Sequence, residues 1–301
     1  MTLTEVRKQF LRHCRSAISL SHHTLRAYCS DLDDTQKYFG LRKRLGAVEK
    51  DHLRQYIRHL REHRKFKETT IKRRLASLKL LFKWAMQEEF ITTNPFDSLN
   101  ERIRLPKRLP RGLDRGDQTT LRKAVAINLR TDDFDVIRGK TAIHLLLDTG
   151  IRVGELVAIN LSDLSLANGC LVINGKGNRQ RLVYLLQKPL HRKIEQYLTW
   201  RSSVPTCTEK LFVNSNGKAI LPPNVRVVLR DIAKDAGVSK HVTPHMLRHT
   251  CATQWLEAGL DIRYVQKLLG HQSISTTEIY THVSDQGLRE ALFRAAGGKK
   301  R

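Results

Sequence analysis

A short basic stretch with two prolines divides the chain into two parts. It spans residues 104–111 (RLPKRLPR) and follows a break at residues 93–96 (TNPF). Proline fixes its own φ and lacks a backbone N–H, so neither a helix nor a central strand continues through this segment. We therefore expect a semi-rigid connector. The predicted organisation is one domain over residues 1–103, a basic linker over 104–113 and a second domain over 114–301.

The charge of both parts favours a polyanionic partner. The 301 residues include 54 Lys and Arg against 29 Asp and Glu, a net charge of +25. Residues 1–113 hold 26 basic and 12 acidic residues, and residues 114–301 hold 28 and 17. Such an excess concerns partners rather than fold, and alone it leaves DNA, RNA and an acidic membrane surface open. A basic linker between two basic domains suits a clamp around one polyanion.

Nothing in the sequence predicts a membrane span or a disulfide framework. No stretch approaches ~18 uninterrupted apolar residues, and the first residues, MTLTEVRKQF, lack the apolar core of a signal peptide. The five cysteines are scattered without a C-x-x-C pair, and His249 with Cys251 lacks the second ligand pair of a zinc site. We expect an intracellular protein with unpaired thiols.

The first part is predicted to be helical. Ser21 can cap a helix that runs to Phe39 and ends at Gly40, a second helix fits residues 48–63, and a third fits residues 69–89. The third helix has apolar residues at helical spacing. They are Ile71, Leu75, Leu78, Leu81, Phe82 and Ala85.

The other face of the third helix carries a basic stripe of Lys72, Lys79 and Lys83. Such a stripe is either a solvated face or a set of phosphate contacts. Because no carboxylate occurs from residue 69 to 87, we expect phosphate contact. The basic linker is expected to contact the same partner through Arg104, Lys107 and Arg108.

The second part is predicted to be mainly helical with one β-hairpin. Apolar runs at residues 170–173 and 182–185 flank a turn at 174–178. Helical patterns occupy the remainder. They cover residues 117–130, 140–148, 155–160, a segment from about 187, 224–236, and the region from Pro244 onward.

Several kinds of chemistry lack their sequence signatures. The nearest match to a phosphate-binding P-loop, around residues 175–177, has Cys170 in place of the first glycine and Gly177 in place of Ser or Thr. No G-x-S-x-G motif occurs. The acidic cluster Asp132, Asp133 and Asp135 could seed a two-metal nuclease site, but a solvated loop is the simpler interpretation. We expect neither a metal nor a nucleotide cofactor.

Four segments of the second part carry candidate chemistry. Residues 148–156 (DTGIRVGEL) place Arg152 at a junction between two helices, and the hairpin tip carries Lys176. Residues 243–250 (TPHMLRHT) place His245 and Arg248 on one helix face. Residues 268–280 contain a Gly-His pair and Tyr280. Each segment alone is compatible with an ordinary structural role.

In this order, the four segments resemble the tyrosine recombinase family, also called the phage integrase family, and most closely its bacterial Xer-type branch. The likeness includes a tyrosine nine residues after the Gly-His histidine and covers nearly the whole chain. Integron integrases carry an added segment between the lysine and the H-x-L-R box, for which the 69-residue interval from Lys176 to His245 is too short. The resemblance implies a catalytic set with Tyr280 as nucleophile and Glu155 in support. That set is Arg152, Lys176, His245, Arg248, His271 and Tyr280.

The implied reaction transfers a DNA phosphoryl group to a protein tyrosine. Two planar guanidiniums, Arg152 and Arg248, suit the negative charge that develops on the non-bridging oxygens. Tyr280 must lose its proton as it attacks, and His245 is of the right type to accept it. Lys176 could protonate the leaving oxygen, and His271 could bind the phosphate or orient the nucleophile.

The resemblance also implies an architecture. A helical SAM-like core-binding domain and a mixed α/β, mostly helical catalytic domain would form a C-shaped clamp on double-stranded DNA. Four subunits, identical or paralogous, would join two duplexes and exchange strands through a Holliday junction, for DNA integration, excision or dimer resolution in the bacterial cytoplasm, at the nucleoid. The last predicted helix, residues 286–296, would dock either on its own domain or on a neighbouring subunit.

Two other functions deserve comparison. A type IB topoisomerase uses similar Arg, Lys, His and Tyr groups, but the two-domain length and the H-x-L-R-H box argue against it. A non-catalytic basic DNA-binding protein would not need every candidate catalytic residue, and all are present. An RNA-binding protein lacks support because no RNP-like aromatic motif occurs.

Overall fold

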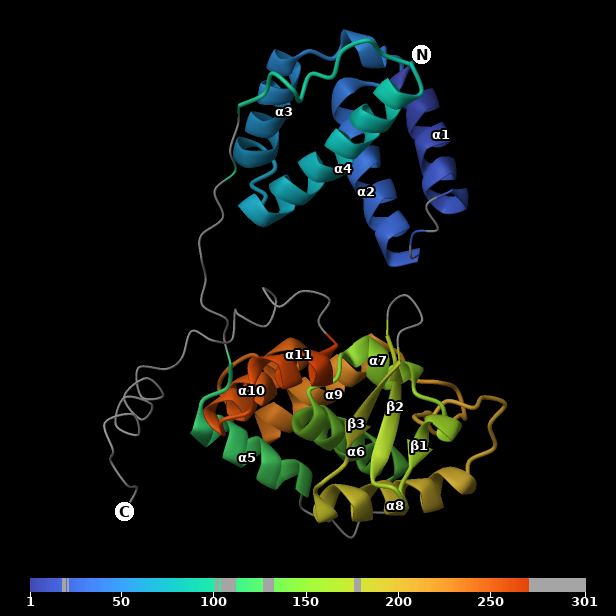
Figure 1. Ribbon diagram of the computed structural model, residues 1–301, viewed down its shortest axis with the longest axis vertical. Helices are drawn as coiled ribbons and strands as arrows, with labels where there is room; N and C mark the ends of the chain where they lie inside the picture. The colour runs from blue at the N-terminus through green and yellow to red at the C-terminus, as the bar shows by residue number, and fades with distance from the viewer. Residues whose placement is uncertain are drawn as a thin grey trace, which may run out of the picture. The chain divides into compact units, whose positions relative to one another are not determined.

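The chain folds into two compact units. The structure, a computed structural model, describes residues 1–17, 20, 22–100, 103, 112–126, 133–175 and 180–270 (Figure 1). The units comprise Met1–Lys107 and Arg108–Arg301. Each has its own buried apolar cluster.

The part of the first unit that the structure describes is a bundle of four helices. They are α1 (Leu3–Ser16), α2 (His22–Phe39), α3 (Lys50–Glu62) and α4 (Glu68–Gln87), with a 3-10 turn, η1 (Leu45–Ala47), before α3. The three predicted helices are confirmed, and their ends differ from the prediction by two residues or fewer. The chain leaves α2 through Gly40, whose φ of +89° suits glycine.

α4 packs against the other three helices of this unit. Its predicted apolar positions are buried, except Leu75, which is half-buried. Two of its arginines pair with carboxylates of the same unit, Arg73 with Asp31 and Arg74 with Asp34, both on α2. The remaining cations of the stripe, Lys72, Lys79 and Lys83, are exposed.

The second unit combines seven helices and a small sheet within the described residues. The helices are α5 (Arg115–Ala126), α6 (Phe134–Thr149), α7 (Val153–Ala158), α8 (Lys188–Ser202), α9 (Pro222–Asp235), α10 (Pro244–Glu257) and α11 (Ile262–Leu269), and a 3-10 turn, η2 (Leu161–Asp163), precedes the sheet. The helical region predicted from Pro244 is interrupted at Gly259, whose φ is +90°, and Asp261 caps the start of α11. The prediction for residues 286–296 lies outside the described residues.

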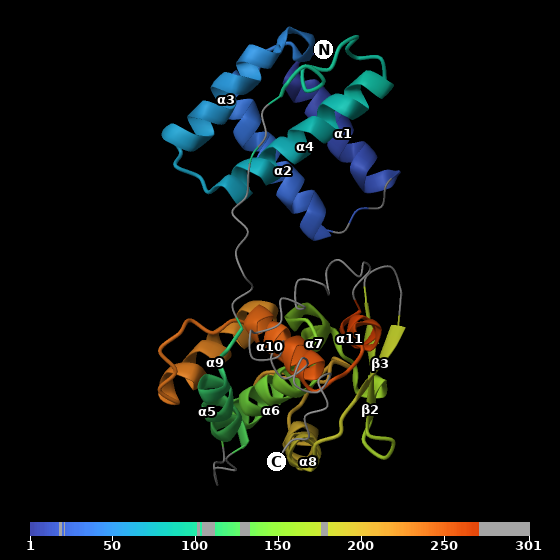
Figure 2. The same ribbon diagram turned by 60° about the vertical axis from the view of Figure 1, so that its left-hand side comes forward.

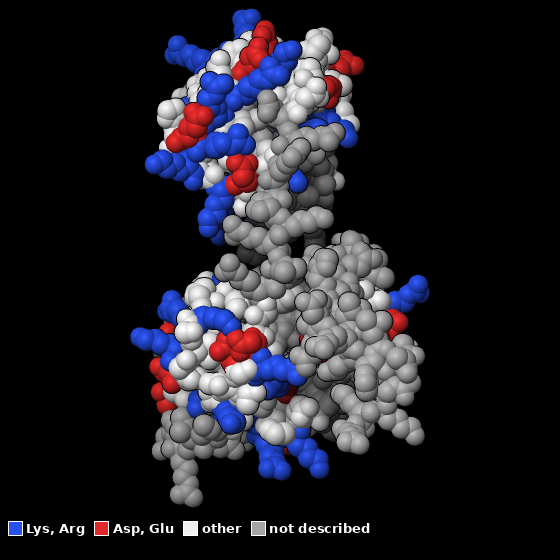
Figure 3. Space-filling model, turned by 90° about the vertical axis from the view of Figure 1, so that its left-hand side faces the viewer, with Lys and Arg blue, Asp and Glu red and all other residues white. Residues whose placement is uncertain are grey.

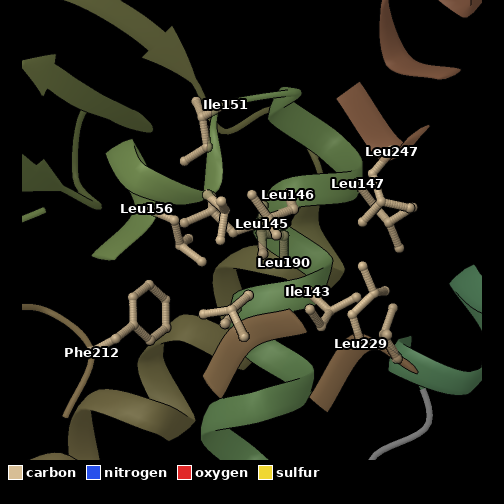
Figure 4. Packing of buried hydrophobic residues seen from close by; sticks show 14 of the residues in the cluster. Ile143, Leu145, Leu146, Leu147, Ile151, Leu156, Leu190, Phe212, Leu229 and Leu247 are labelled. Atoms are coloured by element: carbon tan, nitrogen blue, oxygen red, sulfur yellow. The ribbon is translucent and has the colours of Figure 1, made fainter. Parts of the chain in front are cut away.

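α6 is the central helix of this unit. It contacts α5, α8, α9 and α10, and apolar side chains leave it on several sides, as Figure 4 shows for Ile143, Leu145, Leu146 and Leu147. A helix that is apolar on nearly all sides belongs in a core, where each fully buried leucine contributes about 1.5–3 kcal/mol. The C-terminal end of α6 is therefore a rigid support for the residues that follow it.

The sheet has three antiparallel strands in the order β1 (Leu164–Ser165), β2 (Cys170–Asn174) and β3 (Gln180–Tyr184). The predicted hairpin is confirmed, with Cys170 opposite Tyr184 and Asn174 opposite Gln180. The two-residue strand β1 was not predicted, because so short a strand has no sequence period. Among the described residues, no helix is both long and apolar enough to cross a membrane.

Candidate active site

Three arginine side chains converge on the C-terminal end of α11. Arg181 Nε donates to the carbonyl oxygen of Leu268 at 2.8 Å, and Arg248 Nη2 donates to that of Leu269 at 2.6 Å. Arg152 Nη2 lies 3.5 Å from the carbonyl oxygen of Gly270. The last carbonyls of a helix have no partner within it and carry partial negative charge, so they attract cations. The end of α11 thus gathers arginines from three other elements.

Arg152 is the residue just before α7. Gly150 ends α6 with φ +60°, and a Cβ there would lie 3.1 Å from both Cys251 Cβ and Leu269 Cδ2. Only glycine combines that backbone conformation with so close an approach. The tight turn directs Arg152 to the end of α11 while 41% of its side chain remains exposed.

Arg248 lies on the buried side of α10. Its Nη1 donates to the carbonyl oxygen of Gly150 at 2.8 Å, so it connects α10 to the turn before Arg152. Thr243 is the N-cap of α10, and its hydroxyl accepts from the amide of Met246 at 3.3 Å. His245, three residues before Arg248, is exposed.

Glu155 connects Arg152 to a third arginine. Its Oε1 accepts from Arg152 Nη1 at 2.9 Å and from Arg181 Nη1 at 3.0 Å. Its Oε2 accepts from the Arg152 amide at 2.8 Å and from Arg181 Nη2 at 2.7 Å. Burial alone would raise the pKa of Glu155, but the hydrogen bonds and the two guanidinium charges outweigh burial and leave the pKa below its ordinary value. The carboxylate is therefore ionised at neutral pH.

Sequence reasoning missed Arg181. A signal was available, because side chains alternate along a strand and Arg181 shares a face with the buried Val183. A cation on the buried face of a strand needs a partner. The strand predicted from the sequence begins at Leu182, one residue after Arg181, so the prediction gives Arg181 no role.

A second polar cluster lies at the end of α6. Arg122 pairs with Asp148, and its Nη2 donates to the carbonyl oxygen of Leu147 at 3.1 Å. His144 Nε2 lies 3.4 Å from Asp148 Oδ2, and burial is the main cause that lowers the pKa of this histidine. Burial also raises the pKa of the Cys251 thiol to about 12, which keeps it in the unreactive thiol form.

The structure brings together only part of the predicted set. Arg152, Arg248 and Glu155 meet at the end of α11, and His245 is on the helix that carries Arg248. Lys72, Lys79 and Lys83 lie on α4 in the other unit, and the remaining predicted site residues lie outside the described residues. They are Lys176, His271, Tyr280, Arg104, Lys107 and Arg108.

Two described residues of the acidic cluster at 132–135 have structural partners. Asp133 caps α6 by accepting from the amides of Asp135 and Val136, and Asp135 pairs with Arg138. A carboxylate before the first turn of a helix satisfies otherwise unpaired N–H groups. The helix start accounts for both side chains.

Comparison with known proteins identifies the family. A model described as the phage integrase family matches residues 118–287, and one described as the phage integrase N-terminal SAM-like domain matches residues 8–89. Tyrosine recombinase XerC of Thermodesulfovibrio yellowstonii is 36% identical over 292 residues, 95% of this chain and 94% of that protein. XerC of Listeria innocua is 32% identical over 296 residues, 96% and 97% of the two chains.

A solved structure supports the fold. The integrase of transposon Tn1549 in complex with transposon right-end DNA has a TM-score of 0.79 with 19% identity, and the match covers 98% of this chain and 100% of that one. The chain belongs to the phage integrase family, as its sequence motifs predicted. It is a tyrosine recombinase of the Xer type, similar over nearly its whole length to bacterial XerC proteins.

Proposed function

We propose that this chain cuts and rejoins double-stranded DNA at a specific site through a covalent 3′-phosphotyrosine on Tyr280. The observation that carries the proposal is the meeting of Arg152 and Arg248 at the end of α11. Permanently charged, planar groups held in place before the reaction suit a phosphate that gains negative charge in the transition state. Membership of the phage integrase family supports the same chemistry.

Each site residue has a proposed role. Arg152 and Arg248 bind the non-bridging oxygens, and His245 accepts the Tyr280 proton during attack and returns it during rejoining. Lys176 protonates the leaving 5′ oxygen, and His271 binds the phosphate or orients the nucleophile. Glu155 orders the turn that carries Arg152. These roles agree with the exposed position of His245 one helical turn from Arg248.

The reaction conserves bond energy. A DNA phosphodiester becomes a phosphotyrosine diester and a free 5′ hydroxyl, and a 5′ hydroxyl from another strand reverses the step. No external fuel is required for cutting or joining. In this scheme the fixed cations carry out charge stabilisation and the side chains transfer the protons.

DNA binding is proposed to involve both parts of the chain. Residues 1–103 would form the core-binding domain, residues 104–113 a linker on the DNA and residues 114–301 the catalytic domain. Lys and Arg side chains gather on the face of the first unit in Figure 3. Lys72, Lys79 and Lys83 are exposed, and among the described residues none of them forms an ion pair with a carboxylate, which suits contact with phosphates.

The proposed assembly is a tetramer, of one or two kinds of subunit, on two DNA duplexes. Exchange of strands in pairs would pass through a Holliday junction and lead to integration, excision or dimer resolution. The proposed location is the bacterial cytoplasm, at the nucleoid. Solved relatives of this fold include one bound to transposon-end DNA and another, XerH, bound to its difH substrate.

A nicked duplex tests the proposal. The recognition site is first selected from random duplexes on the purified protein, and a nick near the cleavage position lets the cut strand diffuse away and traps the adduct. We expect a covalent protein–DNA adduct in EDTA and none with Tyr280→Phe. An undiminished adduct in that variant refutes the assignment of Tyr280. Relaxation of plasmids that lack the site would instead favour a topoisomerase.

A further inference from the structure

We propose that Arg181 is a positioning residue that keeps the charge of Arg152 available to the DNA phosphate. Arg181 does so by serving as the counter-ion of Glu155. The inference rests on the proposed function, because it concerns the same phosphate-binding site. No sequence motif gives Arg181 a role.

Arg181 and Glu155 form a two-point ion pair. Arg181 presents two parallel N–H groups to the two oxygens of Glu155, at 3.0 and 2.7 Å. Only 10% of the Arg181 side chain and 9% of the Glu155 side chain are exposed. A two-point contact between a guanidinium and a carboxylate, shielded from water, is the strongest form of this ion pair.

The carboxylate of Glu155 accepts from four N–H donors. An ionised carboxylate offers about four acceptor sites. Glu155 receives two N–H groups from Arg181 and two from Arg152, of which one is the Arg152 amide. With Arg181 in place the carboxylate is saturated, and it needs only one N–H of the Arg152 guanidinium. The exposed remainder of that guanidinium can then face the phosphate.

Loss of Arg181 would leave Glu155 with Arg152 alone as its cation among the described residues. A buried carboxylate without its main counter-ion is costly, and the nearest replacement is the Arg152 guanidinium. Arg152 would turn further toward Glu155, and the carboxylate would neutralise the charge that otherwise attracts the DNA phosphate. Arg181 therefore stabilises the state in which Arg152 is ready to bind phosphate.

Arg181 also fixes the neighbouring backbone. Its Nε donates to the carbonyl oxygen of Leu268, and a Cβ on Gly270 would lie only 2.9 Å from its Nη1. Gly270, with φ +66°, therefore leaves room for the guanidinium. This contact joins β3 to the end of α11, where the chain continues to His271; α11 and β3 lie side by side in Figure 2.

A double-mutant experiment tests the inference. Single-turnover cleavage of the nicked duplex is measured for wild type, Arg181→Gln, Glu155→Gln and the double variant, with DNA affinity measured separately. We expect Arg181→Gln to slow cleavage by about 10- to 100-fold, as when residues that orient ligands at metal sites are removed. DNA affinity should change by less than about threefold, because one of several phosphate contacts is affected.

Glu155→Gln should rescue the Arg181→Gln variant, because the neutral amide no longer attracts Arg152. We expect the double variant to cleave at least about fivefold faster than Arg181→Gln alone, a coupling within the range for residues in direct contact. A double variant as slow as Arg181→Gln, or slower, overturns the inference. So does an Arg181→Gln variant that cleaves like wild type.

Two controls keep the result interpretable. Arg138→Gln removes the ion pair of another buried arginine, whose partner Asp135 is half-exposed, at the opposite end of α6, and should leave the cleavage rate of folded protein unchanged. A duplex with sulfur at the bridging 5′ position needs no protonated leaving group. Because Arg181 acts on Arg152, that duplex should leave the ratio of wild-type to Arg181→Gln rates unchanged.

Collapse of that ratio on the sulfur duplex would overturn the inference and assign Arg181 to the protonation step. Failure of wild type to form any adduct would instead refute the proposed function. Folding of each variant is monitored by thermal unfolding. Glu155→Gln also relieves the stability cost of the unpaired carboxylate, so rates are compared at a temperature where thermal unfolding shows every variant to be fully folded, and a restored rate then reports the site rather than the fraction folded.

Discussion

Substitution of Gly150 by alanine tests whether the turn after α6 sets the geometry of the site. The residue has φ +60°, and a left-handed conformation costs a non-glycine residue about 1–2 kcal/mol. The new methyl group would also lie 3.1 Å from Cys251 Cβ and from Leu269 Cδ2, both in buried side chains. Overpacking of this kind costs about 1–3 kcal/mol. We expect the free energy of unfolding to fall by about 2–5 kcal/mol, the sum of the two terms.

Gly237 offers a matched control in the same unit. Its φ is +78°, and a Cβ there would meet no atom within 4 Å. Gly237→Ala should therefore cost only the backbone term of about 1–2 kcal/mol. The difference between the two variants isolates packing, because the smaller entropy of alanine in the unfolded chain affects both alike.

Urea unfolding followed by tryptophan fluorescence provides the assay. In a Trp84→Phe background the signal comes from Trp200 and Trp255, both in the second unit. Equal midpoints and slopes for Gly150→Ala and Gly237→Ala would refute the reasoning. At a temperature where both are folded, only Gly150→Ala should slow cleavage, because the Gly150 carbonyl accepts from Arg248.

Two further predictions concern pH and salt. Burial is the main cause that lowers the pKa of His144. As the pH falls through the ordinary histidine pKa of about 6.5, the unfolded state therefore binds more protons than the folded state. The free energy of unfolding should decline on acidification through that range. His144→Asn should flatten this decline in urea unfolding series between pH 7 and 5, and an unchanged slope would contradict the assignment. Replacing Lys72, Lys79 and Lys83 together by Gln should reduce the slope of log affinity against log salt by up to about 2.7 if all three contact phosphates. Binding measured across salt concentrations checks this, and an unaltered slope would remove the three residues from the interface.

The helices were predictable because their apolar residues repeat with the helical period. Every residue of the predicted α4 pattern is buried or half-buried. The strand β1 could not be predicted, since its two residues acquire their conformation only by pairing with Leu171 and Cys170. The sequence also could not show which cations of α4 are paired, because the carboxylates that pair with Arg73 and Arg74 lie on another helix.

The site was predictable where its residues share a short segment. Arg152 and Glu155 are three residues apart, and their contact follows from the start of one helix. The contact of Arg181 with Glu155 spans 26 positions and depends on the register of β3 against β2 and on the packing of β3 beside α11. Neither is encoded in a local pattern, so strand alternation can single out Arg181 as a cation in need of a partner, but only the assembled fold identifies Glu155 as that partner.

The arginines of the site are held mainly by backbone carbonyls, which leaves their positive charge available to attract phosphate. Carboxylates would fix arginines firmly but would cancel their charge. Helix-end carbonyls fix them with partial charges only, and the carbonyls of Leu268, Leu269 and Gly270 do so for three guanidiniums. The guanidiniums of Arg152 and Arg181 share one carboxylate, that of Glu155, and Arg181 balances its charge. Arg152 therefore keeps its positive charge while its position is set before DNA arrives, which is the condition for stabilising a transition state rather than merely binding a polyanion.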